Sequence, residues 1–149
     1  MTGTPAPLPV PAATLGEGPC WDSSSGSLYW VDIPAGRVHR LDGDGAFRSW
    51  DVGQAVGAGD AIPDGLAVDA EGCVWVALWD GGAVLRFGPD GRLMQTLELP
   101  TPMVSSCAFG GPDLETLYVT TAAGPGSSGG ELFRLQAGVT GLASHAYQG

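Results

Sequence analysis

The feature that most constrains the fold is a short apolar stretch of strand length that occurs three times. The three stretches cover residues 28–33, 74–79 and 117–121, and their starts lie 46 and 43 residues apart. Each follows a Gly- or Asp-containing turn and precedes a second strand-like stretch that begins with glycine. A period of about 40–50 residues with several short strands per unit is typical of the blades of a β-propeller.

The rest of the chain agrees with an all-β fold. Twenty-five glycines and twelve prolines interrupt the apolar stretches, and helical patterns are almost absent. We predict a Pro-rich extended lead over residues 1–13 and a partial propeller domain over residues 14–149. The domain is predicted to contain three four-stranded blades, over residues 17–51, 65–99 and 105–148, with a Gly/Ala-rich connector over 54–60.

Three blades do not close a ring, since closed propellers typically have about four to eight. A single chain should therefore leave an apolar blade face uncovered at each end. Two copies would supply six blades, so we expect self-association, in the simplest case as a homodimer that completes the ring.

Charge and cysteine content restrict the partners and the compartment. The formal net charge is −10 and all six basic residues are arginine. This balance argues against binding to nucleic acid or to an anionic membrane surface, and it suits divalent cations, although solubility explains it equally well. No apolar run approaches the roughly 20 residues of a membrane helix, and the start of the chain lacks the features of a secretory signal. Three cysteines without a CxxC pair fit a reducing cytoplasm.

Two short motifs each place one carboxylate beside glycine and proline where a strand is about to begin. They are Gly-Glu17-Gly-Pro and Pro-Asp64-Gly. All-β enzymes tend to hold metal ligands in such segments, because a rigid scaffold fixes the side chain. The alternatives are a solvated turn residue for Glu17 and a type I or II turn for Asp64.

The two segments and their surroundings resemble the SMP-30/gluconolactonase/regucalcin family. The stretch from Leu15 to about Asp42 is similar to the opening of that family, and residues 62–147 are similar to its final third. The resemblance implies the blades of a six-bladed propeller, a divalent metal (Ca²⁺, Zn²⁺, Mn²⁺ or Mg²⁺) and hydrolysis of sugar lactones. The middle of the family's fold has no counterpart here.

In that family the metal is held by a glutamate of the opening motif, an asparagine from the middle of the chain and the aspartate of Pro-Asp-Gly. Glu17 and Asp64 match the first and the last, but the chain contains no asparagine. The family's sugar-contacting residues also belong to the missing middle. The resemblance therefore implies a gluconolactonase-like hydrolase with an incomplete site, in which Glu17 and Asp64 hold the metal and Asp64 acts as the base. The alternatives are a non-catalytic cation-binding or interaction fragment and the relic of an internal deletion.

Other motifs have plainer interpretations. Asp42-Gly-Asp-Gly45 resembles the start of a calcium loop, but Gly53 stands where a bidentate glutamate belongs, so a hairpin turn is favoured. Ser128 lies in a formal GxSxG motif that no helix pattern follows, and a loop is the better interpretation. His39 and His145 lack a second ligand at metal spacing and are interpreted as ordinary strand residues.

The remaining candidates are expected to be structural. Asp32 could line the channel, although a carboxylate at a strand end is the default. The cysteines are predicted to be buried small apolar groups, at Cys20, Cys73 and Cys107. The tryptophans are predicted to pack between blades rather than to stack on a sugar, at Trp21, Trp30, Trp75 and Trp79.

Overall fold

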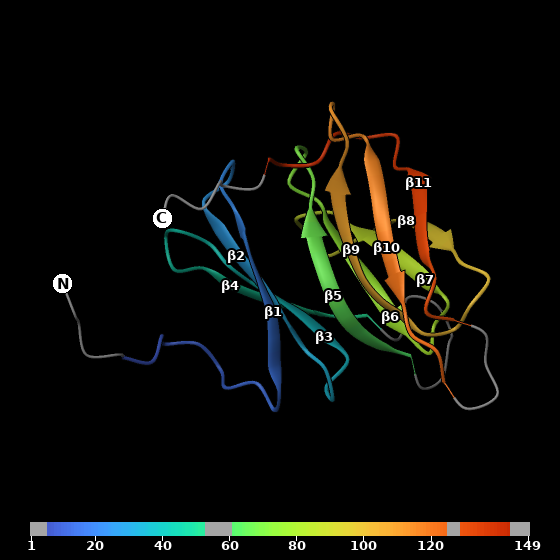
Figure 1. The fold of residues 1–149 in the computed structure, drawn as a ribbon. Coiled ribbons are helices and arrows are strands. Elements are labelled where there is room, and N and C mark those ends of the chain that lie inside the picture. Colours follow the sequence, from blue (N-terminus) through green and yellow to red (C-terminus); the bar gives the residue numbers. More distant parts are fainter. Residues whose placement is uncertain (1–5, 53–60, 125–128, 144–149) are drawn as a thin grey trace.

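The computed structural model describes residues 6–52, 61–124 and 129–143, which form three antiparallel sheets and contain no helix (Figure 1). Blade 1 is β1 (Gly16–Asp22), β2 (Ser27–Asp32), β3 (Arg37–Leu41) and β4 (Phe47–Asp51). Blade 2 is β5 (Ile62–Val68), β6 (Val74–Trp79), β7 (Ala83–Phe87) and β8 (Leu93–Glu98). Blade 3 is β9 (Val104–Gly110), β10 (Thr116–Thr121) and β11 (Leu132–Gln136).

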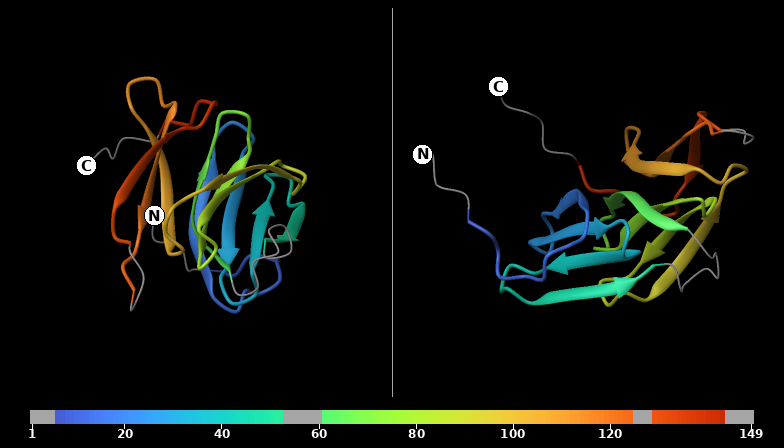
Figure 2. Two further views of the ribbon diagram at one scale, coloured as in Figure 1. Left: turned by 90° about the vertical axis from the view of Figure 1, so that its right-hand side faces the viewer. Right: turned by 90° about the horizontal axis from the view of Figure 1, so that it is seen from below.

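The sheets follow one another along an arc, with blade 2 between the other two (Figures 1 and 2). Each blade is a meander in which sequential strands pair, as the 46- and 43-residue repeat predicts. The all-β partial propeller is therefore confirmed. Blade 3 has three described strands instead of the predicted four, and the predicted 54–60 connector and residues 144–148 of the predicted third blade lie outside the described residues.

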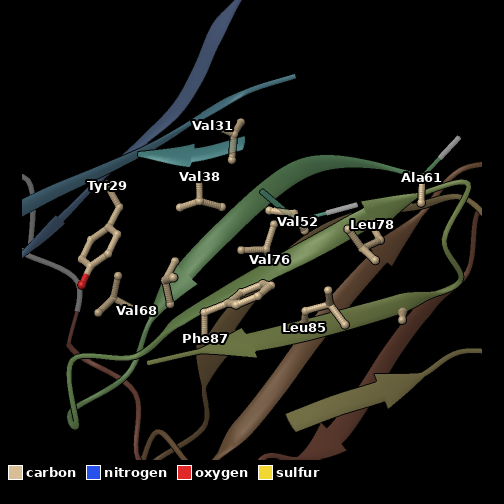
Figure 3. Packing of buried hydrophobic residues seen from close by; sticks show 12 residues of the cluster. Tyr29, Val31, Val38, Val52, Ala61, Val68, Val76, Leu78, Leu85 and Phe87 are labelled. Carbon is tan, nitrogen blue, oxygen red and sulfur yellow. The ribbon is translucent and has the colours of Figure 1, made fainter. Parts of the chain in front are cut away.

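Apolar side chains fill the two spaces between blades. Between blades 1 and 2, Tyr29, Val31 and Val38 pack against a group of blade 2 residues that includes Val76, Leu85 and Phe87 (Figure 3). Trp75 of blade 2 is fully buried against blade 3 and meets the Phe109 ring edge-on. Burial of these faces is the main stabilising term for the arc.

Each of the first two blades also encloses a buried arginine. Arg86 donates to the fully buried carboxylate of Asp69 at 2.8 Å and to Glu71 at 2.6 Å. Asp69 accepts further hydrogen bonds from the amides of Glu71 and Cys73 and from the Trp75 indole. In blade 1, Arg40 pairs with Asp42 at 2.6 Å. Paired in this way, the buried charges are tolerated.

The outward faces of blades 1 and 3 have no neighbouring blade among the described residues. Trp30, His39 and Phe47 stack on one another on the outward face of blade 1, with ring centroids 5.2–6.0 Å apart. The described part of the predicted lead, from residue 6, forms no strand and passes along this face, with Leu8 and Val10 near Leu28.

Asp32 holds the lead to the blade. The amides of Thr14 and Leu15 donate to its carboxylate at 2.8 and 3.2 Å. The hydrogen bond from Thr14 is the main cause that lowers the pKa of Asp32, although burial opposes it. Asp32 is therefore a structural carboxylate at the end of β2, as its default interpretation predicts.

The tryptophans are only partly as predicted. Trp75 packs between blades, but Trp21 is 55% exposed and Trp30 lies on the outward face of blade 1. These two belong to strand positions that face away from blade 2, where the described residues provide no further blade and only the lead lies nearby. Trp50, which the sequence did not single out, packs between blades 1 and 2 against Tyr29 and Phe87.

Candidate metal centre

The first strand of each blade lies at the centre of the arc. β5 contacts both β1 and β9, and all three strands start at the same end of the molecule (Figure 1). Each contains one extra residue relative to its partner strand, close to its start. The pairing shifts between Glu17 and Cys20 in β1, between Pro63 and Leu66 in β5, and between Val104 and Ser106 in β9. These are β-bulges, which commonly redirect a side chain near a functional site.

The bulges place three side chains at corresponding positions. Trp21, Val68 and Phe109 occupy equivalent positions, because they pair with the equivalent residues Leu28, Val74 and Leu117. The residues four positions before them are Glu17, Asp64 and Ser105. Glu17 and Asp64 thus occupy the same position in adjacent blades, at the same end of their strands. Ser105 is a candidate that the sequence reasoning missed. The repeat could have located it, because Glu17 and Asp64 lie five residues before Asp22 and Asp69, and Ser105 lies five residues before the equivalent Gly110.

The two carboxylates differ in their surroundings. Glu17 is exposed, whereas Asp64 is half-buried. Burial raises the pKa of Asp64, and the negative charge of Glu17 raises it further, while a hydrogen bond from the Gly65 amide opposes both. Asp64 is therefore close enough to Glu17 for their charges to repel one another. A cation placed between them would remove this repulsion.

Gly65 explains why the motif contains glycine. A Cβ built on Gly65 would lie 2.5 Å from the Cβ and 2.8 Å from the Cα of Ser106 in β9. Pro63, Asp64 and Gly65 belong to a bulged strand, so the alternative of a type I or II turn is wrong. Glycine is therefore required at this position for the close approach of the β5 and β9 backbones.

The donor set is suitable for a hard cation but small. Carboxylate and hydroxyl oxygens are the ligands that Ca²⁺ and Mg²⁺ prefer. Within the described ranges, no group of three or more His, Cys, Asp or Glu side chains could hold a metal. The Ser105 hydroxyl lies 3.0 Å from that of Thr120 in the neighbouring strand. The chain thus offers two carboxylates and one hydroxyl at its bulges.

A hollow of about 370 Å³ lies between β1, β5 and β9 and is lined by the later residues of these strands. Its lining includes Pro19, Leu66 and Cys107, and neither Glu17 nor Asp64 is part of it. Cys73 and Cys107 are buried, as predicted, whereas Cys20 is half-buried. Burial raises the pKa of Cys107 to about 12, which keeps its thiol protonated and inert.

The other residues singled out from the sequence do not join this centre. His39 belongs to β3 on the outward face of blade 1, and burial lowers its pKa. Asp42-Gly-Asp-Gly45 is the predicted hairpin turn, closed by a 2.9 Å hydrogen bond from the Gly45 amide to the Asp42 carbonyl. Ser128 and His145 lie outside the described residues.

Comparison with known proteins places these features in a family. The sequence profile of the SMP-30/Gluconolactonase/LRE-like region matches residues 15–59 and 51–123 in two segments. Regucalcin of Xenopus laevis is 38% identical over 112 residues, which are 72% of this chain and 38% of that protein. The pentonolactonase XacC of Haloferax volcanii is 44% identical over 92 residues, or 54% of this chain and 32% of that protein.

A solved structure agrees with the sequence comparisons. The crystal structure of regucalcin from Agrobacterium tumefaciens, described as a calcium-binding protein, superposes with a TM-score of 0.76 at 27% identity. The match covers 91% of this chain but only 50% of that one, so this chain spans half or less of the relatives it matches. The paired bulges with Glu17 and Asp64, the blade architecture and the profile lead to one conclusion: the chain belongs to the SMP-30/gluconolactonase/LRE-like family.

Proposed function

We propose that the protein is a metal-dependent hydrolase of sugar lactones whose site within one chain is incomplete. The observation that carries the proposal is the placement of Glu17 and Asp64 on corresponding bulges of adjacent blades, near enough for their charges to interact. The names of the lactonase relatives support the substrate class.

Glu17 and Asp64 would hold the cation, which we expect to be Ca²⁺, Zn²⁺, Mn²⁺ or Mg²⁺. When bound, the cation supplies Lewis-acid chemistry by polarising the lactone carbonyl and acidifying a water. The Asp64 carboxylate takes the proton of the water whose oxygen bonds to the carbonyl carbon. The ring C–O bond then breaks, and the proton passes to the departing ring oxygen, which leaves an open-chain hydroxy acid.

The inventory of ligands also supports a second candidate function. Two carboxylates fix a cation less firmly than a full set of protein ligands would, and the chain has no asparagine to match the family's middle ligand. A fragment that binds a divalent cation without turnover, or that acts as an interaction module, fits this set. Measurement of binding and turnover on the same preparation separates the two functions.

The experiment compares metal-stripped protein with protein given Ca²⁺, Mn²⁺, Zn²⁺ or Mg²⁺. Hydrolysis of gluconolactone is followed by acid release, and cation binding by calorimetry. We expect metal-dependent turnover that falls about 10²–10⁴-fold in Asp64→Asn, the range for loss of a general base. Glu17→Gln should weaken the binding of the cation, whereas Glu98→Gln, on the outermost strand of blade 2, and Ser128→Ala should change neither quantity.

The outcomes are distinct. Turnover that survives the loss of Asp64 would show that the assigned base is wrong. Cation binding that depends on Glu17 and Asp64 but brings no turnover would establish the second function instead.

The compartment is also a proposal. The described residues contain no helix long and apolar enough to cross a membrane. Cys20, Cys73 and Cys107 are free thiols. Free thiols persist in a reducing environment, which supports the cytoplasm.

A further inference from the structure

Each blade presents the same four-residue pattern on the face that points toward the following blade. We call these residues the leading quartet: an aromatic residue paired across the strands with an arginine, and two smaller residues paired beside them. The quartets are Tyr29, Val31, Val38 and Arg40 in blade 1; Trp75, Ala77, Val84 and Arg86 in blade 2; and Tyr118, Thr120, Leu132 and Arg134 in blade 3.

In blades 1 and 2 the leading quartet is buried against the next blade. The Arg40 guanidinium lies 5.6 Å from the centre of the Tyr29 ring and donates to the Pro89 carbonyl of blade 2 at 3.2 Å. The Tyr29 hydroxyl donates to the Gly72 carbonyl of blade 2 at 3.3 Å. Arg86 lies at the same 5.6 Å from the ring of Trp75. The quartet is thus the part of a blade that docks on its neighbour.

In blade 3 the same quartet faces no blade within the described residues. Leu132 is 66% exposed, whereas its counterpart Val38 is fully buried. Arg134 is exposed, whereas Arg40 and Arg86 are buried. The exposed leucine beside an aromatic–arginine pair repeats a docking surface that is used twice elsewhere in the chain.

Blade 1 carries the complementary surface. In blade 2 the residues that receive the blade 1 quartet are Val74, Val76, Leu85 and Phe87. Their counterparts in blade 1 are Leu28, Trp30, His39 and Leu41, which we call the receiving face. Beside it lies a hollow of about 370 Å³ that is lined by Leu28, Leu41, Gly26 and Gly43, and also by Leu8, Pro9 and Val10 of the lead, which an arriving blade would displace. By position in their turns, Gly26 and Gly43 correspond to Gly72 and Pro89, the residues whose carbonyls accept from Tyr29 and Arg40.

We infer that the leading quartet of blade 3 docks on the receiving face of blade 1 in a second copy of this chain. The two surfaces are the two ends of one arc, and they repeat an interface that is present within it. Three blades are half of the six implied by the family, and the chain covers 50% of a complete relative. Two copies joined head to tail at both ends would therefore close a ring with twofold symmetry.

The charges and unpaired polar groups of the receiving face suit this partner. Asp44 lies next to the turn residues that line the hollow, where it would face the Arg134 guanidinium, whereas Asp42 in the same turn already pairs with Arg40. His39 is buried, and its Nδ1 forms no hydrogen bond with any described residue. The inference does not depend on lactone hydrolysis.

The first test is the mass in solution. Sedimentation of the full chain should show a species of about 30 kDa, twice the 15.1 kDa of the monomer. Leu132→Glu should raise the dissociation constant of the dimer at least tenfold. Met94→Glu is the matched control, since Met94 is similarly exposed, at 54%, on the outermost strand of blade 2. A monomer at about 100 μM would overturn the inference and would indicate that the chain's own lead covers the receiving face. Equal dissociation constants for the two variants would also overturn it.

The second test identifies which surfaces meet. Leu41→Glu damages the receiving face. If circular dichroism shows that Leu41→Glu does not fold, Phe47→Ser is used in its place, because Phe47 stacks on Trp30 and His39 of the same face. Leu132→Glu and Leu41→Glu should each be monomeric alone. Mixed together, they should form heterodimers, because one of the two interfaces then joins two undamaged surfaces. If the dimer instead paired identical faces, only one of the two substitutions would disrupt it, and mixing the two variants would not restore a dimer. That result would refute the head-to-tail arrangement.

Discussion

Replacement of Gly65 by alanine should force β5 away from β9 at the bulge that carries Asp64. The new methyl group would lie 2.8 Å from the Cα of Ser106, and ordinary carbon–carbon separations are about 3.5–4.0 Å. The two backbones must therefore separate by about 1 Å. Overpacking of this kind typically costs about 1–3 kcal/mol, and Gly65→Ala should lie at the upper end, because a backbone atom cannot turn aside as a flexible side chain can. For a domain of this size each kcal/mol lowers the melting temperature by about 2–4 °C.

The assay is urea unfolding followed by tryptophan fluorescence, with a melting curve as a second measure. Gly16→Ala is the control, because its methyl group would meet its nearest neighbour at an ordinary 3.6 Å and its backbone is not left-handed. We expect a change within about 0.5 kcal/mol for Gly16→Ala. Ser106→Gly combined with Gly65→Ala should recover part of the loss, since it removes the Cβ but leaves the Cα in place. If Gly65→Ala is as stable as Gly16→Ala, or if Ser106→Gly gives no recovery, the close approach is not what requires glycine.

Two further predictions concern charged groups. Asp69→Asn should destabilise the fold by about 3 kcal/mol in the same urea assay, because it leaves the buried Arg86 with Glu71 as its remaining carboxylate partner. Asp90→Asn, in an exposed turn, is the control and should change the stability by less than about 0.5 kcal/mol. Equal effects of the two substitutions would contradict the role of the Asp69 network. Asp64→Asn should stabilise the metal-free protein at neutral pH by about 0.5 kcal/mol. Folding raises the pKa of Asp64, so at a pH above that pKa its ionised carboxylate is less favourable in the folded than in the unfolded state, and the neutral amide removes this cost. Glu17→Gln should lower the pKa of Asp64 in an NMR titration, and an unchanged pKa would show that the two carboxylates do not interact.

The repeat could be predicted because the apolar stretches of the three blades recur at a nearly constant spacing along the chain. The equivalence of the leading quartets also follows from it, since Arg40, Arg86 and Arg134 recur at the same offset. Bulges escape such reasoning, because one extra residue changes the pairing without changing the composition of the strand. Asp64 therefore had a turn as its alternative, and Ser105 was missed. Trp50 was missed because packing between blades depends on a neighbour that lies outside its own repeat.

The family resemblance identified Glu17 and Asp64, but only the fold shows how they come to lie at corresponding positions of adjacent blades. Their motifs lie 47 residues apart in the sequence, and the shared bulge position brings them to one end of adjacent strands. Physical reasoning from the sequence could not establish this, since the position depends on the register of two separate sheets. The absent asparagine, by contrast, was evident from composition alone.

The two proposals become coupled if both hold. A ring of two copies would repeat Glu17, Asp64 and Ser105 twice around one channel, which brings four carboxylates to the same end. Their mutual repulsion opposes closure of the ring, and bound divalent cations would offset it. A cation that binds more tightly to the ring than to the single chain must, by thermodynamic reciprocity, tighten the dimer by the same factor. Sedimentation with and without Ca²⁺ measures this coupling directly, and Glu17→Gln should weaken the response to Ca²⁺ while it strengthens the dimer in the absence of metal.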